Sequence, residues 1–146
     1  MCRLFGMSAA PQRDRATFWL LDAEDGLAVQ SRREPDGTGL GAFSPSGRPI
    51  VSKQPVAAYE DATFAHEART LVSTTFIAHI RFASTGAVAR ANTHPFEQHG
   101  RLLAHNGVIG GLDRLELELG DDRALVHGDT DSERFFALVT RRTEEA

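Results

Sequence analysis

The sequence predicts a folded α+β domain, because segments with helical and with extended periodicity alternate along a chain of ordinary composition. Hydrophobic residues make up 41% and charged residues 25% of the chain, a balance that separates it from disordered proteins. Between Asp61 and Val72 the apolar residues fall on one face of a helix. The next segment, Thr74 to Arg81, is rich in β-branched and aromatic residues and predicts a strand.

The N-terminal segment Cys2 to Ser8 alternates in the manner of a short strand, although neither of its faces is cleanly polar. Ala16 to Leu21 then predicts a helix. The polar stretch Arg32 to Gly37 contains Pro35, which interrupts both regular patterns, so we expect a loop there.

The next segments predict a β-hairpin. Gly39 to Phe43 and Pro49 to Lys53 are strand candidates, and the turn residues Ser44 to Gly47 separate them. The run Gly37 to Ala42 formally satisfies a dinucleotide-binding glycine pattern. That pattern requires a strand before it and a helix after it, whereas here a loop precedes and a turn follows. We therefore expect no dinucleotide-binding site there.

A fifth strand candidate, Arg101 to His105, ends at an Asn106-Gly107 turn signal. Leu112 to Leu119 suits a helix and a strand equally well, and its periodicity leaves both open. Thr130 to Glu133 has the spacing of a capping box, so we expect a helix to start near Asp131. No linker or repeat divides the chain, which predicts one domain over residues 1–146.

Charge and hydropathy exclude several classes of partner. A net charge of -4 provides no basic stripe for nucleic acid, so we expect small molecules or proteins as partners. The apolar runs are too short to span a membrane, and the N-terminus lacks a secretory signal pattern. These features, and a single cysteine that cannot form an intrachain disulfide, predict a cytoplasmic protein with a free thiol.

That thiol belongs to Cys2, directly after the initiator methionine. Once Met1 is removed, the α-amino group of Cys2 lies next to its own thiol and can act as the general base. Cysteine at position 2 alone is more often an accident or a small buried apolar residue, so other motifs have to support a catalytic role.

Five further observations support it, because five segments occur together in the order found in one enzyme family. These segments are Met1-Cys-Arg-Leu-Phe-Gly-Met-Ser8, Ala78-His-Ile-Arg-Phe-Ala-Ser-Thr-Gly86, Asn92-Thr-His-Pro-Phe96, Ala104-His-Asn-Gly107 and Gly128-Asp-Thr-Asp-Ser-Glu133. From residue 2 to about residue 133 the sequence resembles the class II, or N-terminal nucleophile, glutamine amidotransferases, and its stand-alone members in particular.

The resemblance implies a fold and a reaction. The fold is an αββα sandwich, two stacked sheets covered by helices, which our own strand and helix predictions could not have established. The reaction is hydrolysis of the glutamine side-chain amide through a thioester on Cys2. Ammonia then passes to a synthase domain or partner protein. No cofactor is implied.

The resemblance also assigns catalytic roles. Asn106 and Gly107 would form the oxyanion hole with a side-chain amide and a backbone N–H. Alone, this pair is a common turn signal, and both roles are compatible.

Substrate-binding roles fall on a second set of residues. Arg81 would bind the α-carboxylate of glutamine, because a guanidinium grips a carboxylate with two parallel bonds. Asp131 would bind its α-ammonium group, although an acidic residue in the first turn of a helix is favoured in any case. The loop residues Ser84, Thr85 and Gly86 would add contacts to the substrate.

We expect no metal site. His94, His99 and His105 are close in sequence, but their spacing matches no zinc motif, and one cysteine cannot build a thiolate site. His79 and His105 are expected on core strands, and His94 in a packing or hydrogen-bonding role near the active-site loop.

Two alternatives remain open. The alternatives to a glutaminase are a hydrolase of another γ-glutamyl compound, which would keep Arg81 and Asp131, and a non-catalytic glutamine-binding subunit. Members of the family also usually continue beyond the last motif, so we expect an N-terminal part that lacks strands of one sheet.

Overall fold

The computed structural model describes residues 1–145, and Ala146 lies outside the described residues. Short helical turns that are not α-helices are labelled η. In chain order the elements are β1 (Arg3–Ser8), η1 (Phe18–Asp22), α1 (Leu27–Gln30), β2 (Thr38–Phe43), β3 (Pro49–Gln54), α2 (Ala62–Thr70), β4 (Thr75–Ile80), η2 (Arg90–Asn92), β5 (Phe96–Gln98), β6 (Arg101–Leu103), α3 (Leu112–Leu119), η3 (Gly120–Leu125) and α4 (Asp131–Glu144).

Within residues 1–145, the strands form a four-stranded sheet in the order β1-β4-β2-β3 and a two-stranded sheet of β5 and β6. All pairs are antiparallel. The predicted hairpin is confirmed, because Phe43 pairs with Pro49 beside the turn. In the β1–β4 pair Arg3 lies opposite Ile80, so the residue before β1 and the residues after β4 meet at the same end of the sheet.

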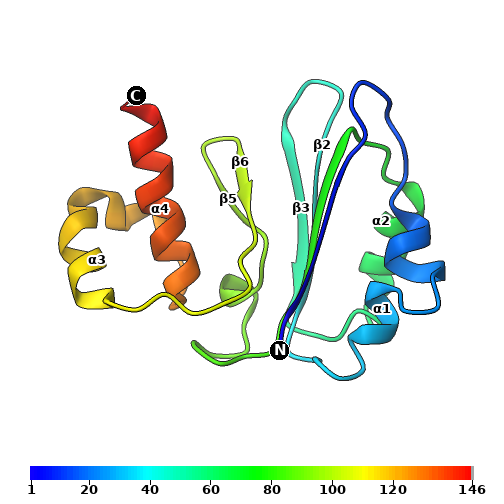
Figure 1. The fold of residues 1–146 in the computed structure, drawn as a ribbon, viewed down its shortest axis with the longest axis horizontal. Coiled ribbons are helices and arrows are strands. Elements are labelled where there is room, and N and C mark those ends of the chain that lie inside the picture. Colours follow the sequence, from blue (N-terminus) through cyan, green and yellow to red (C-terminus); the bar gives the residue numbers. More distant parts are fainter. Residues whose placement is uncertain (146) are drawn as a thin grey trace.

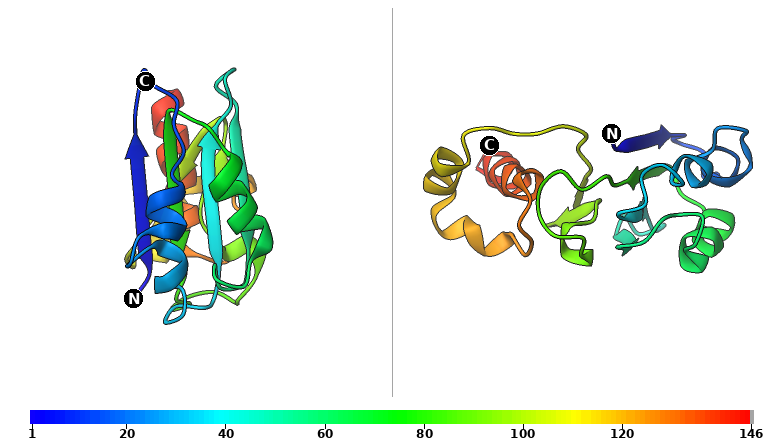
Figure 2. Two further views of the ribbon diagram at one scale, coloured as in Figure 1. Left: turned by 90° about the vertical axis from the view of Figure 1, so that its right-hand side faces the viewer. Right: turned by 90° about the horizontal axis from the view of Figure 1, so that it is seen from below.

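The elements are arranged in layers. Helices α1 and α2 cover one face of the four-stranded sheet, β5 and β6 face its other side, and α3 and α4 lie beyond them (Figure 1). The side view in Figure 2 shows the long strands running roughly parallel to α4. The predicted α+β class is confirmed.

The main core fills the space between the four-stranded sheet and its covering helices. Its largest fully buried members include Phe64 from α2, Phe76 from β4 and Leu40 from β2. Burial of each such side chain stabilises the fold by about 1.5–3 kcal/mol. The helix predicted at Ala16 to Leu21 is a single π-type turn one to two residues later, in which the N–H of Ala23 donates to the carbonyl of Phe18.

A smaller core lies between α3 and α4, and it shows that the segment Leu112 to Leu119, which suited a helix and a strand equally well, is a helix. Leu115 and Leu119 are buried, whereas Leu117 between them is 83% exposed. This is the pattern of one helical face, because a strand would turn all three side chains to the same side.

A close backbone approach connects the two sheets. A Cβ added to Gly39 would lie 1.8 Å from the carbonyl oxygen of His94, so only glycine fits at this place in β2. Gly39 is therefore a position at which two backbone segments approach closely.

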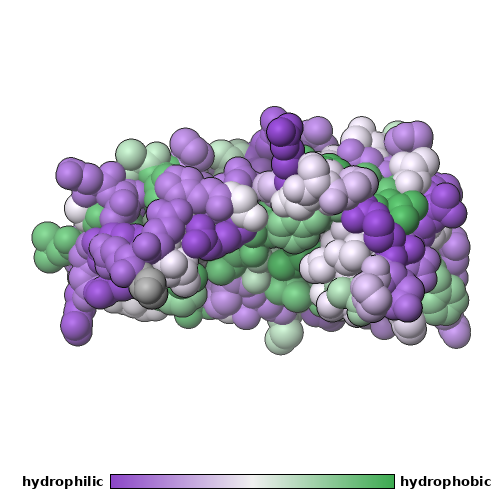
Figure 3. All heavy atoms as spheres, turned by 90° about the horizontal axis from the view of Figure 1, so that it is seen from above, coloured by the Kyte–Doolittle hydropathy of each residue, from purple (hydrophilic) through white to green (hydrophobic). Residues whose placement is uncertain are grey.

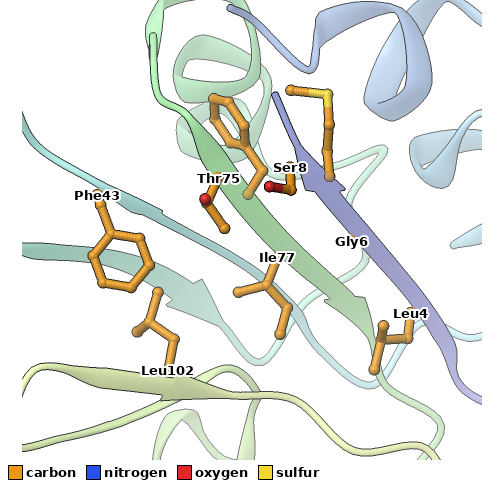
Figure 4. A pocket seen from close by; sticks show the side chains of 9 residues that line it. Leu4, Gly6, Ser8, Phe43, Thr75, Ile77 and Leu102 are labelled. Carbon is orange, nitrogen blue, oxygen red and sulfur yellow. The ribbon is translucent and has the colours of Figure 1, made fainter. Parts of the chain in front are cut away.

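One apolar hollow remains open between the sheets. It has a volume of about 390 Å³ and lies between Leu4 of β1, Ile77 of β4 and Leu102 of β6 (Figure 4). Seen from above, hydrophobic atoms gather near the middle of the molecule, between its polar ends (Figure 3).

No helix within residues 1–145 is long and apolar enough to cross a membrane.

Candidate active site

Cys2 lies at the end of the four-stranded sheet, beside the chain that leaves β4. Its Sγ accepts a hydrogen bond from the backbone N–H of Phe82 over 3.2 Å, and it lies 3.4 Å from the Phe82 carbonyl oxygen. The residue is partly exposed. The β1–β4 register thus places the thiol next to the segment that follows Arg81.

Asn106 reaches the same point from the other half of the chain. Its side-chain Nδ2 donates to the carbonyl oxygen of Cys2 over 2.8 Å. The predictions that the strand ends at His105 and that a hairpin turn follows at Asn106-Gly107 were wrong. Strand β6 ends at Leu103, and no hairpin follows, because the next element is helix α3. The chain instead runs past Cys2, where the side chain of Asn106 binds it.

Gly107 has a backbone conformation that only glycine adopts readily. Its φ is 155°, and an added Cβ would lie 2.9 Å from Nε2 of His105. The imidazole of His105 also forms a 3.0 Å hydrogen bond with the hydroxyl group of Ser132. His105 therefore lies between the backbone of Gly107 and the start of α4.

Arg81 is 3% exposed and holds the loop that follows it. Its Nη1 donates to the carbonyl of Ala87 over 2.9 Å, and its Nη2 donates to those of Thr85 and Gly86 over 2.6 and 3.2 Å. Ser84, Thr85 and Gly86 are exposed on this loop. Burial lowers the pKa of Arg81, and the charge of Asp36 opposes that shift. The guanidinium nevertheless stays charged.

Asp131 is the first residue of α4 and is 4% exposed. Its Oδ2 accepts a 2.6 Å bond from the N–H of Ile109, and its Oδ1 accepts from the N–H of Ser132. The predicted helix start is confirmed, because the hydroxyl of Thr130 accepts from the N–H of Glu133 as an N-cap. Asp131 thereby joins α4 to the chain after Gly107.

Residues from five segments of the sequence surround a pocket of about 30 Å³ beside the thiol. Its lining consists of Cys2, His79, Arg81, Phe82, Ser84, Thr85, His94, His105, Gly107, Thr130, Asp131 and Ser132. Two expected site residues do not line it: Asn106 touches the backbone of Cys2 instead, and Gly86 contacts Arg81 through its carbonyl. The volume suffices for about one water molecule.

Two buried histidines form the floor of this pocket. The rings of His79 and His94 lie 4.3 Å apart, and Nδ1 of His94 accepts from the N–H of His105 over 3.2 Å. His79 is 1% exposed, and neither ring nitrogen has a partner among residues 1–145. Burial lowers the pKa of His79 to about 4 and that of His94 to about 2. Both rings are therefore neutral near pH 7.

Three residues that support the site were assigned no site role from the sequence, although Asn92 and Glu133 lie in the matched segments. Asp36 accepts from the N–H of Ala83 over 2.8 Å. Asn92 donates to the carbonyl of Ala87 and accepts from the N–H of Asp129. Glu133 binds the backbone N–H groups of residues 127 and 128. Each fixes a loop next to the pocket.

Among the described residues, no group of three or more His, Cys, Asp or Glu side chains is arranged to hold a metal ion.

The sequence is similar to those of proteins from other organisms. A protein of Methanocaldococcus jannaschii without a described function is 38% identical over 122 residues, which cover 80% of this chain and 33% of that protein. The Escherichia coli protein named "Putative glutamine amidotransferase YafJ" is 35% identical over 147 residues, covering 97% of this chain and 55% of that protein. The chain thus spans about a third to about half the length of these relatives.

Solved structures show the same fold. Glutamine phosphoribosylpyrophosphate amidotransferase from B. subtilis superimposes with a TM-score of 0.67 at 21% identity, covering 97% of this chain and 29% of that one. The family model described as "Glutamine amidotransferases class-II" matches residues 1–145. The chain therefore belongs to the class II glutamine amidotransferases.

Proposed function

We propose that this domain, residues 1–146, hydrolyses the side-chain amide of glutamine and releases ammonia for transfer to an acceptor. The observation that carries the proposal is the meeting of Cys2 and Asn106, 104 residues apart in the chain, beside a pocket that Arg81 and Asp131 also line. A nucleophile, an amide donor, a cation and an anion are the groups that this reaction requires.

The reaction begins after removal of Met1. The free α-amino group of Cys2 accepts the proton of the thiol, and Sγ bonds to the amide carbon of glutamine. The amide oxygen becomes negative and receives hydrogen bonds from Asn106 and Gly107. The C–N bond then breaks, the α-amino group returns its proton to the leaving nitrogen, and ammonia departs. Water hydrolyses the remaining thioester to glutamate.

Arg81 and Asp131 would bind the two charged groups at the other end of glutamine. Arg81 has five N–H donors, and its bonds to three loop carbonyls leave others for a carboxylate. The carboxylate of Asp131 suits the α-ammonium group. A pocket of about 30 Å³ is too small for the ten non-hydrogen atoms of glutamine. Entry of the substrate therefore requires the loop with Ser84, Thr85 and Gly86 to move.

The layer order of helices, sheet, sheet and helices supports an αββα sandwich of the N-terminal nucleophile type. The acceptor of ammonia would be bound by a synthase domain or a partner protein. The B. subtilis structure, whose name includes phosphoribosylpyrophosphate, illustrates such an acceptor in that protein.

Ammonia release from glutamine and from asparagine, and glutamate release from γ-glutamyl peptides, test the proposal. We expect release from glutamine that is abolished in Cys2→Ser, and none from asparagine. Faster cleavage of a γ-glutamyl peptide than of glutamine would favour a hydrolase of other γ-glutamyl compounds. Glutamine binding without turnover by the processed chain would instead indicate a binding subunit.

A further inference from the structure

A second pocket shares no lining residue with the one beside Cys2, although the segments 90–96 and 127–133 contribute to both. Its volume is about 400 Å³, within the range of small-molecule sites. Strand β3 contributes Lys53, η2 contributes Arg90, and β5 contributes Phe96. His127 and Glu133 complete the side next to α4.

Lys53 is the only lysine in the chain, and it lines this pocket. Nζ lies 4.7 Å from the ring centroid of Phe96. No side chain or carbonyl among residues 1–145 forms a hydrogen bond or ion pair with it. Burial lowers the pKa of Lys53 to about 8; the charge of Glu133 opposes this shift, and that of Arg90 adds to it. The ammonium group is thus partly desolvated, and no carboxylate among residues 1–145 forms an ion pair with it.

The acidic groups nearby are already engaged. Both carboxylate oxygens of Glu133, which is 4% exposed, accept backbone N–H groups, from His127 over 3.1 Å and from Gly128 over 2.7 Å. Glu97 accepts from the N–H of Gly100. Lys53 and Arg90, in contrast, form no ion pair with a carboxylate among residues 1–145. Nε of Arg90 donates to the carbonyl of Lys53 over 3.2 Å, which brings the guanidinium next to the strand that carries the lysine.

We propose that this pocket binds a small molecule through an oxyanion group, a carboxylate or a phosphate, held by Lys53 and Arg90. A guanidinium and an ammonium group from adjacent elements are the donors that such a group prefers. Val51, Pro95 and Phe96 line the pocket as an apolar surface for the rest of the ligand. Small-molecule sites commonly combine an apolar lining with a few polar groups in this way.

The two pockets share a wall. The ring of Phe96 lies 4.6 Å from that of His94, which lines the pocket beside Cys2. Glu133 fixes the loop that leads to Asp131. The ligand would therefore bind directly behind the glutamine site without occupying it.

Amine-selective acylation tests this assignment, because Lys53 and the N-terminal α-amino group are the only amines in the chain. The rate at each amine is measured by mass spectrometry near pH 7.5 in inorganic phosphate, in citrate and in sodium chloride of equal ionic strength. An oxyanion that restores an ordinary pKa to Lys53 should slow its acylation about ten-fold or more, while the α-amino group is little affected. Protection by phosphate alone or by citrate alone identifies which oxyanion the pocket takes.

Two arginine variants locate the effect. Arg90→Gln should lose most of the protection of Lys53, whereas Arg48→Gln, at an exposed arginine next to the β2–β3 turn, should keep it. Equal protection by chloride, no protection by either oxyanion, or full protection in Arg90→Gln would overturn the proposal. Because wild-type protein serves in the main comparison, the result does not depend on how a variant folds.

Discussion

The side-chain amide of Asn106 donates a hydrogen bond to the carbonyl oxygen of Cys2 over 2.8 Å. This contact joins the proposed oxyanion donor to the residue that carries the proposed nucleophile, so the two are held in a fixed relative position. An Asn amide has two N–H donors, and one of them remains for a bound substrate.

Asn106→Ala should lower kcat about 10²–10³-fold and leave KM for glutamine nearly unchanged, because the lost bond strengthens chiefly in the transition state. Steady-state ammonia release measures both constants. Asn106→Gly is the informative companion, since glycine tolerates any backbone requirement at this position but has no side-chain donor. A stable and fully active Asn106→Gly enzyme would remove the side chain from the oxyanion hole.

Arg81→Lys should raise KM for glutamine more than it lowers kcat. Lysine has a compact ammonium group and cannot make the forked contacts of a guanidinium. It also cannot hold the carbonyls of Thr85, Gly86 and Ala87 together, so hydrogen exchange of residues 84–88 should accelerate. Alkylation of Cys2 by a small reagent should proceed at an undiminished rate. The control is Arg48→Lys, and an unchanged KM in Arg81→Lys would exclude this residue from the site.

Acid should destabilise the fold through the buried histidines. The folded-state pKa of His79 is about 4, below the ordinary value of 6.5, so the unfolded chain binds protons that the folded chain does not. Stability from this residue is fully present above about pH 6.5 and is lost progressively as the pH falls towards 4, by roughly 3 kcal/mol. His94 acts in the same direction.

Denaturant unfolding between about pH 4 and pH 7 measures this dependence. A conservative His79→Gln variant should flatten the slope, whereas His66→Gln, at an exposed position, should not. A wild-type stability that stays constant over this window would show that His79 is not buried in its neutral form.

Glu133→Gln should cost about 1–3 kcal/mol, because the new amide places an N–H₂ group against one of the two backbone N–H donors of residues 127 and 128. The matched control is Glu118→Gln, which removes an exposed ion pair with Arg114 and should cost under about 0.5 kcal/mol. Equal melting temperatures for the two variants would contradict a role for Glu133 in fixing this loop.

Long regular elements were predictable from the sequence, and short or tertiary features were not. The periodicity of residues 61–72 and the capping pattern at Thr130 predicted α2 and the start of α4 closely. Strand β5 went unrecognised because three residues carry no usable period. The capping box forms only in part. Thr130 caps the helix, but the Glu133 carboxylate binds the N–H groups of residues 127 and 128 and not that of the N-cap residue.

The site follows the same rule. Motifs named Cys2, Arg81, Asn106 and Asp131, and six of the eight expected residues line the pocket beside the thiol. No motif could indicate that Arg81 binds the carbonyls of its own loop, or that Asn92 joins this loop to Asp129. Such contacts depend on the path of the backbone, and a residue 37 positions away gives no local pattern.

The most direct test of the N-terminal nucleophile mechanism compares the chain that starts at Cys2 with one that retains Met1. Intact-mass measurement after rapid quenching with glutamine detects the γ-glutamyl thioester, and ammonia release gives the rate. We predict a glutamyl adduct on the N-terminal peptide and turnover only for the chain that starts at Cys2, because only there does the free α-amino group adjoin the thiol. Equal turnover of glutamine by the folded chain with Met1 in place would contradict the mechanism.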